Sequence, residues 1–219
     1  MSAQTSALVT GANKGIGYEI AVGLGALGWK VGVGARDQGR LDDAVARLRE
    51  TGTDAYGVLL DVADDASVAA AAAQVQEQVG GLDVLVNNAG ITGGMPQTPS
   101  EADIAMIRRV LETNVFGVIR TTNAFLPLLR RSGSPRVVNM SSTVGSLTRQ
   151  SGPGDETGPI AIAYSPSKTF LNGITVQYAK ELRGTGILVN LACPGFVATD
   201  LNGFRGHRTP EQGAAIAIR

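Results

Sequence analysis

Short apolar runs alternate with amphipathic segments along almost the whole chain, and this alternation is the feature that most constrains its fold. The runs are apolar throughout, which is typical of strands in a sheet that is covered on both faces. Strands that alternate with helices are joined by right-handed crossovers and form a parallel sheet. The sequence therefore predicts an α/β fold with a doubly wound parallel sheet, whose expected strands are residues 7–9, 31–34, 56–60, 84–86, 137–138 and 187–191.

Apolar residues recur at helical spacing between these strands, so the connecting segments are predicted to be helices. Residues 145–158 break the pattern, because they are polar and rich in Gly, Ser and Thr. This stretch is too long for an ordinary connection and is expected to be either a functional or a flexible loop. No linker or internal repeat divides the sequence, so residues 1–219 are expected to form one domain. The expected helices are residues 18–27, 41–48, 68–79, 114–129 and 171–182.

The composition excludes several classes of protein. The 19 basic and 19 acidic residues cancel, so no general attraction to nucleic acid or to an anionic membrane is expected. With only Cys193 and His207, the chain lacks an internal disulfide framework and a Cys/His zinc cluster, and no metal site is expected. Cys193 is interpreted as a small packed side chain and His207 as a loop residue. Because the N-terminus has no secretory pattern and no apolar run approaches about 18 residues, a cytoplasmic location is expected.

A glycine-rich turn lies between the first expected strand and the first expected helix, and it reads Thr10-Gly-Ala-Asn-Lys-Gly-Ile-Gly17. Glycines in that position allow a sharp turn and let the backbone approach a pyrophosphate at the N-terminus of the helix. A literal Gly-x-Gly-x-x-Gly at Gly23, Gly25 and Gly28 lies inside and at the end of the helix, so it is not expected to bind phosphate. The first cluster therefore predicts a dinucleotide-binding site.

The end of the second expected strand is where the adenosine ribose of such a cofactor is bound. Ala35 occupies the position at which an acidic residue usually binds the 2′-hydroxyl. Arg36 follows it and Lys14 lies in the glycine turn, and a guanidinium and an ammonium suit a 2′-phosphate. Asp37 is expected to turn outward and cap the next helix. NADP(H) is therefore expected in preference to NAD(H).

Tyr164 and Lys168 are four residues apart at the start of an expected helix, so they share one face of it. A tyrosine is a poor acid or base at neutral pH unless its pKa is lowered. A neighbouring lysine, together with a cationic nicotinamide, is expected to lower that pKa by stabilising the phenolate. The alternative is a tyrosine that only begins a helix, beside a solvated lysine.

Taken together and in order, these motifs resemble those of the short-chain dehydrogenase/reductase family, and within it the NADPH-dependent carbonyl reductases. The resemblance covers nearly the whole chain. It implies a Rossmann fold with strand order 3-2-1-4-5-6, and the family's seventh strand is missing from this sequence. The motifs are Thr10-Gly-Ala-Asn-Lys-Gly-Ile-Gly17, Leu60-Asp-Val62, Asn87-Asn-Ala-Gly90, Asn114, Val138-Asn-Met-Ser-Ser142, Tyr164-x-x-x-Lys168, and Cys193-Pro-Gly195 with Thr199.

The resemblance implies a role for each matching residue. Tyr164 protonates the substrate oxygen, Ser142 binds that oxygen, and Lys168 binds the nicotinamide ribose and lowers the pKa of the tyrosine. Asn114 kinks its helix and holds a water molecule linked to Lys168. The residues implied to bind the cofactor are Gly11, Asn13, Lys14, Gly15, Ile16, Gly17, Arg36, Asp61, Val62, Asn88, Ala89, Gly90, Tyr164, Lys168, Pro194, Gly195, Val197 and Thr199.

The implied function is the reduction of a ketone or aldehyde to an alcohol with NADPH. The alternative is a regulator or scaffold that binds NADP without turnover. A serine hydrolase is disfavoured, because Ser165-Pro-Ser-Lys168 lacks the accompanying motifs of that class. The expected partners are a small carbonyl or alcohol substrate and further copies of the chain, as a homodimer or homotetramer. Phe170, Gly173, Gln177 and Tyr178 provide a surface suited to close approach of another helix.

The C-terminal residues predict a helix that stops early. Thr209 is a helix cap, Pro210 fits the first turn, and Gln212 can reach back as in a capping box. A helix of residues 213–219 is short for independent stability, and strand 187–191 is expected at an open sheet edge. We therefore expect the natural protein to continue by about 20–30 residues, enough for the rest of the helix and one strand.

Overall fold

The computed structural model describes residues 4–95, 97–152 and 158–218. A sheet of six parallel strands runs through the molecule in the order β3-β2-β1-β4-β5-β6. This confirms the predicted strand order, and every expected strand is present. The strands are β1 (Ser6–Thr10), β2 (Lys30–Ala35), β3 (Asp54–Leu59), β4 (Val84–Asn87), β5 (Arg136–Met140) and β6 (Leu188–Ala192).

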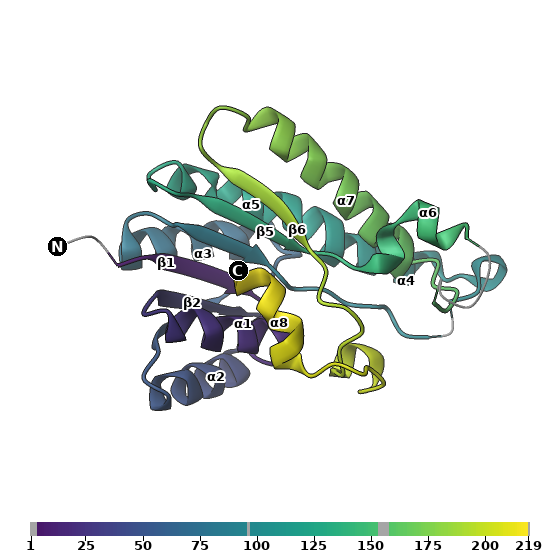
Figure 1. Cartoon of the computed structure of the whole chain (residues 1–219), viewed down its shortest axis with the longest axis horizontal. Helices are drawn as coiled ribbons and strands as arrows, with labels where there is room; N and C mark the ends of the chain where they lie inside the picture. The colour runs from purple at the N-terminus through teal and green to yellow at the C-terminus, as the bar shows by residue number, and fades with distance from the viewer. Residues whose placement is uncertain (1–3, 96, 153–157, 219) are drawn as a thin grey trace.

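Helices cover both faces of the sheet, which confirms the doubly wound architecture (Figure 1). One face packs against α1, α2 and α8, and the other against α3, α5 and α7. Apolar side chains of α1, α2 and α8 on one face and of α3 and α5 on the other pack against the strands, so the sheet separates two apolar cores. Most of the residues that α7 buries are polar. These helices are α1 (Gly15–Ala26), α2 (Gln38–Glu50), α3 (Asp65–Val79), α5 (Gly117–Leu129), α7 (Tyr164–Glu181) and α8 (Pro210–Ile218).

The helix expected at residues 114–129 begins earlier in the structure. Asp103 caps α4 (Ile104–Leu111), which continues through a π-helical turn (η2, Glu112–Phe116) into α5. The apolar pattern did not predict α4, because only Met106 and Val110 of this short helix are buried. Part of the expected loop at 145–158 is also helical, as the short helix α6 (Leu147–Gln150), and its residues 153–157 lie outside the described part.

Two glycines of the second cluster serve helix packing, a role that the sequence pattern did not predict. Gly23 and Gly25 lie inside α1. A Cβ atom at Gly23 would lie 2.3 Å from the side chain of Ile218 in α8, and one at Gly25 would lie 2.4 Å from Thr53. Neither glycine lines the cofactor groove described below. Close packing of α1 against its neighbours therefore accounts for both residues.

The capping box predicted for the C-terminal helix is present. The Thr209 amide donates to Oε1 of Gln212 at 3.0 Å, and the Gln212 amide donates to Oγ1 of Thr209 at 3.3 Å. β6 lies at the edge of the described sheet, where Leu188 is 52% exposed and Leu191 is 42% exposed. That the natural protein continues past residue 219 stays a prediction. None of the described helices is long and apolar enough to cross a membrane.

Tyr56→Phe is expected to leave the stability unchanged or to raise the free energy of unfolding by about 1 kcal/mol. The Tyr56 hydroxyl is buried and has no hydrogen-bond partner among the described residues. Burial also raises its pKa well above the ordinary value. Thermal unfolding tests this, with Tyr178→Phe as the control, because the Tyr178 hydroxyl donates to Oδ1 of Asn123 at 2.8 Å. A larger loss of thermal stability in Tyr56→Phe than in Tyr178→Phe would contradict the prediction.

Candidate active site

A groove of about 490 Å³ lies where the carboxyl ends of the strands meet. It opens between β1 and β4, where the strand order reverses, and open α/β sheets bind their ligands at such a point. Thirteen of the residues predicted to bind the cofactor line it: Gly11, Asn13, Lys14, Gly15, Ile16, Gly17, Arg36, Asp61, Val62, Asn88, Ala89, Gly90 and Thr199.

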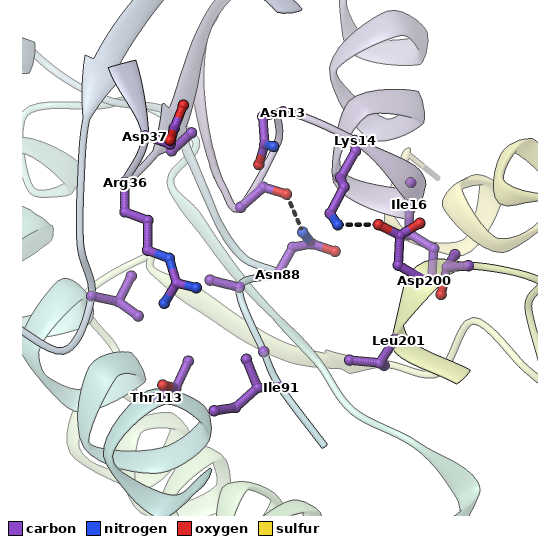
Figure 2. A pocket seen from close by; sticks show the side chains of 18 of the residues that line it. Asn13, Lys14, Ile16, Arg36, Asp37, Asn88, Ile91, Thr113, Asp200 and Leu201 are labelled. Carbon is purple, nitrogen blue, oxygen red and sulfur yellow. Dashed lines mark hydrogen bonds and ion pairs between the residues drawn. The ribbon is translucent and has the colours of Figure 1, made fainter. Parts of the chain in front are cut away.

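The glycine turn after β1 is held open by Asn88 and Thr10. The side-chain amide of Asn88 donates to the main-chain oxygens of Thr10 at 2.9 Å and Gly11 at 3.1 Å (Figure 2). Oγ1 of Thr10 accepts from the amides of Asn88 and Ala89, each at 3.0 Å. A Cβ atom at Gly17 would lie 2.4 Å from Nδ2 of Asn88, so only glycine fits there. The turn therefore leaves the N-terminus of α1 accessible, which fits a cofactor pyrophosphate.

Cations gather at the end of the groove that lies next to β2 and α2. The Asp37 carboxylate accepts from the main-chain amide of Arg40 at 2.9 Å, which confirms that it caps α2. Figure 2 shows the Arg36 guanidinium reaching into the groove, and Arg40 also lines it. Lys14 forms an ion pair with Asp200, and this bond holds the pKa of Asp200 below its ordinary value. Among the described residues, neither Arg36 nor Arg40 forms an ion pair with a carboxylate, whereas Lys14 does.

The predicted catalytic pair lies at the start of α7. Tyr164 is the first residue of this helix, and Lys168 follows one turn later. Nζ of Lys168 is buried, donates to the main-chain oxygen of Met140 at 2.7 Å and lies 5.7 Å from the centre of the Tyr164 ring. The side chain of Ser142, which follows β5, lies close enough to the Tyr164 phenol to lower its pKa. The structure thus brings Ser142, Tyr164 and Lys168 together from separate segments.

Burial dominates the titration of this pair in the protein alone. It raises the pKa of Tyr164 to about 12, and the nearby Ser142 side chain acts in the opposite direction. Burial also lowers the pKa of Lys168 to about 8, and the charge of nearby Cys193 acts in the opposite direction. The expected lowering of the tyrosine pKa by Lys168 is therefore not seen without cofactor. The phenol is protonated at neutral pH, which is the state that a proton donor needs.

Asn114 lies in the π-helical turn between α4 and α5, so the predicted distortion of this helix is confirmed. Its side-chain amide donates to the main-chain oxygen of Ile91 at 2.8 Å and to Oγ of Ser167 at 3.0 Å. Its oxygen accepts from the Ile91 amide at 2.8 Å. Since Ser167 precedes Lys168, Asn114 ties the groove wall to the helix that carries the catalytic pair.

Five of the predicted cofactor contacts do not line the groove: Tyr164, Lys168, Pro194, Gly195 and Val197. Val197 is buried against Gly213 of α8, and Gly195 lies against the side chain of Arg208. Pro194 is likewise absent from the groove lining. The interpretation of Cys193 as a packed residue is wrong, because the structure leaves this side chain exposed at the end of β6.

Sequence reasoning missed several residues of the groove. Arg40 lies three positions after Asp37 in the first turn of α2, and that spacing is a signal that could have identified it. Ile91 and Thr113 carry no recognisable motif, since one lies in the loop after β4 and the other in the π-helical turn. The groove is also lined by Ala35, Asp37 and Leu60 near the ends of β2 and β3, and by Thr92, Gly93, Asp200 and Leu201 from the segments after β4 and β6.

Two further features lie outside the groove. His207 is a loop residue, as expected, and its ring centre lies 5.9 Å from that of Phe196. On α7, Phe170, Gly173 and Gln177 are exposed, so the predicted contact surface is accessible. The described residues include no cluster of three or more His, Cys, Asp or Glu side chains placed to hold a metal ion.

The family profile described as "short chain dehydrogenase" matches residues 5–209. "Short-chain dehydrogenase/reductase 1" of Saponaria officinalis is 37% identical over 270 residues, covering 97% of this chain and 88% of its own. Salutaridine reductase from Papaver somniferum superposes with a TM-score of 0.87 at 28% identity, covering 99% of this chain and 95% of that one. A variant actinorhodin polyketide ketoreductase with NADPH gives a TM-score of 0.85 at 34% identity, with coverages of 98% and 88%. The chain therefore belongs to the short-chain dehydrogenase/reductase family of oxidoreductases, which act on small molecules with a nicotinamide nucleotide.

Proposed function

We propose that the protein is an NADPH-dependent reductase that converts a ketone or aldehyde into an alcohol. The observation that carries this proposal is the Tyr164, Lys168 and Ser142 cluster beside a groove whose glycine turn fits a dinucleotide. The similarity to two reductases, one of them with NADPH, supports the same reaction. We further propose that residues 1–219 act as one catalytic domain, and that copies of it associate through α7.

Each residue of the cluster has a defined task in this proposal. The Tyr164 phenol donates a proton from its Oη to the substrate carbonyl oxygen, and the Ser142 hydroxyl binds the same oxygen. The Lys168 ammonium opposes the negative charge that develops on the phenol as the proton leaves. Asn114 holds the start of α7 against the groove wall at Ile91. NADPH, when bound, supplies the hydride to the carbonyl carbon.

The substrate side of the groove favours a partly apolar carbonyl compound. Met95 is 44% exposed, Leu147 69%, Phe196 50% and Phe204 67%. These side chains come from the segments that follow β4, β5 and β6, which lie at the same end of the sheet. Apolar side chains left exposed around a groove are typical of a site that binds an apolar ligand.

The proposal is tested by following NADPH absorbance with cyclohexanone, acetophenone, decalone and phenanthrenequinone in turn. A reductase oxidises NADPH only when one of these compounds is present. A protein that binds NADPH and reduces none of them, nor any in a wider carbonyl panel, is better described as a silent NADP-binding regulator or scaffold. NADPH binding without any oxidation of NADPH would thus favour the regulator or scaffold over the reductase.

Arg36→Ala is expected to weaken NADPH binding by roughly 1.5–3 kcal/mol, because it removes a charge-assisted bond to the 2′-phosphate. Arg40→Ala is expected to weaken NADPH binding by a smaller amount, since Arg40 lies further along the chain, in the first turn of α2. NADH binding should change little in both variants. Titration with 2′,5′-ADP and with 5′-AMP isolates the phosphate, because the two ligands differ only in that group.

Arg183→Ala is the matched control for this experiment. Arg183 is exposed, carries the same charge, follows α7 and does not line the groove. Its removal should leave the affinity for 2′,5′-ADP unchanged. Equal affinity of the unmodified protein for 2′,5′-ADP and 5′-AMP would contradict the proposed preference for NADPH.

A further inference from the structure

The buried side chain of Gln97 joins the loop after β4 to the helix that carries Tyr164. Gln97 is 2% exposed. Its amide nitrogen donates to the main-chain oxygens of Thr92 at 2.5 Å and Gly94 at 2.6 Å. Its amide oxygen accepts from the main-chain amides of Ala163 at 3.1 Å and Tyr164 at 3.4 Å. A side-chain amide offers two N–H groups and two lone pairs, so every position is used.

These contacts complete the N-terminus of α7. The first N–H groups of a helix have no partner inside it, and α7 has no capping side chain of its own. The Ser165 amide donates to the main-chain oxygen of Ala161 at 3.1 Å, and Pro166 has no N–H group. The two remaining amides at this end belong to Ala163 and Tyr164, and both donate to Gln97. A residue from another segment therefore caps the helix at its catalytic residue.

The other half of the same amide holds a wall of the groove. Thr92 and Gly93 line the groove, and the two main-chain oxygens bound by Gln97 flank Gly93. Gly93 is packed tightly against α4, since a Cβ atom there would lie 2.6 Å from the sulfur of Met106. Gln97 thus connects a fixed groove wall on one side with the start of α7 on the other.

We infer that Gln97 is a positioning residue for the reaction at Tyr164, because its amide fixes the first residue of α7 relative to the groove wall at Thr92–Gly94. The inference rests on the proposed reductase function. Gln97 acts through main-chain atoms, so its removal shifts the phenol and removes no reacting group. A displacement of a reacting group by about 1 Å can lower a rate on the order of 10²-fold.

Gln97→Leu removes all four hydrogen bonds, and Gln97→Glu removes only the donors. At pH 8 both variants are expected to lower kcat by about 10–100-fold, with the dissociation constant of NADPH changed by less than about threefold. The carboxylate introduced in Gln97→Glu faces two carbonyl oxygens and repels them, whereas its protonated form can donate to one. The kcat of Gln97→Glu should therefore recover as the pH falls, and that of Gln97→Leu should not.

This pH dependence separates positioning from a loss of folded protein. The four partners of the Gln97 side chain are main-chain atoms, so none of them titrates. Gln74→Leu is the matched control, because Gln74 donates from its side chain to the main-chain oxygen of Gly57 at 2.9 Å, outside the groove. An unchanged kcat in Gln97→Leu, or a constant ratio of the two Gln97 variants across pH, would overturn the inference.

Hydrogen exchange gives a readout that does not depend on turnover. Gln97→Leu is expected to speed exchange at the amides of Ala163 and Tyr164, and Gln74→Leu is not. If the unmodified protein reduces no carbonyl compound, the proposed function fails, while the exchange result still shows whether Gln97 holds the start of α7. Unchanged exchange at these amides would reject the inference by itself.

Discussion

Tyr164→Phe is expected to lower kcat by about 10²–10⁴-fold, because it removes the general acid of the proposed reaction. The phenol lies against Ser142 and close to Lys168, and its pKa of about 12 keeps it protonated across the neutral range. The variant keeps the aromatic ring, so the packing at the start of α7 should change little. The affinity for NADPH should change little as well, because the groove lining does not include the tyrosine hydroxyl.

The measurement is steady-state reduction of the best ketone in the panel, combined with NADPH titration by fluorescence. Tyr178→Phe provides the control, since Tyr178 lies on the same helix and donates to Asn123 away from the groove. Reduction needs the protonated phenol, so the rate of the unmodified protein should fall as the pH rises toward the pKa of Tyr164. Oxidation of the alcohol needs the phenolate and should show the opposite trend. A near-native rate in Tyr164→Phe would remove Tyr164 as the acid.

Local patterns predicted the parts of the site that depend on neighbours in the chain. The cap at Asp37 and the capping box at Thr209 each involve residues within a few positions, so the sequence alone specifies them. The glycine turn could be identified from its own residues, although Asn88 from a distant segment holds it open. The apolar runs similarly predicted every strand, because buried parallel strands need apolar side chains on both faces.

Features that depend on distant contacts were not predictable in the same way. The role of Gln97 depends on the contact between the loop after β4 and the start of α7. The role of Asp200 depends on its ion pair with Lys14, which is distant in the sequence. Both side chains look like ordinary surface residues in the sequence. The pKa of Tyr164 is similar, because the sequence placed Lys168 beside it but did not show how deeply both groups are buried.

Lys168→Met is expected to abolish most of the activity and to stabilise the fold. Burial lowers the pKa of Lys168 from 10.5 to about 8, so the folded protein disfavours the charged ammonium. A pKa shift of this size corresponds to a cost of roughly 3 kcal/mol for burying the charged ammonium, and the variant no longer has this cost. The variant also loses the hydrogen bond from Lys168 to Met140, which contributes about 1 kcal/mol to the stability of the unmodified protein. The variant should therefore unfold with a free energy higher by about 1–2 kcal/mol, while kcat falls by about 10²-fold or more.

The pH dependence of stability tests separately whether Lys168→Met raises the free energy of unfolding. Between pH 8 and pH 10.5 the unfolded chain holds the Lys168 proton more tightly than the folded protein does, so the stability of the unmodified protein rises with pH in that window. Lys168→Met lacks this titrating group. The excess of its free energy of unfolding over that of the unmodified protein should therefore be largest below pH 8 and should shrink toward pH 10.5. Lys180→Met is the control, because Lys180 is exposed on the same helix and should show neither effect. Denaturant unfolding at pH 7 and pH 10 measures the difference, and a loss of stability in Lys168→Met at pH 7 would show that the buried ammonium is held more favourably than its surroundings suggest.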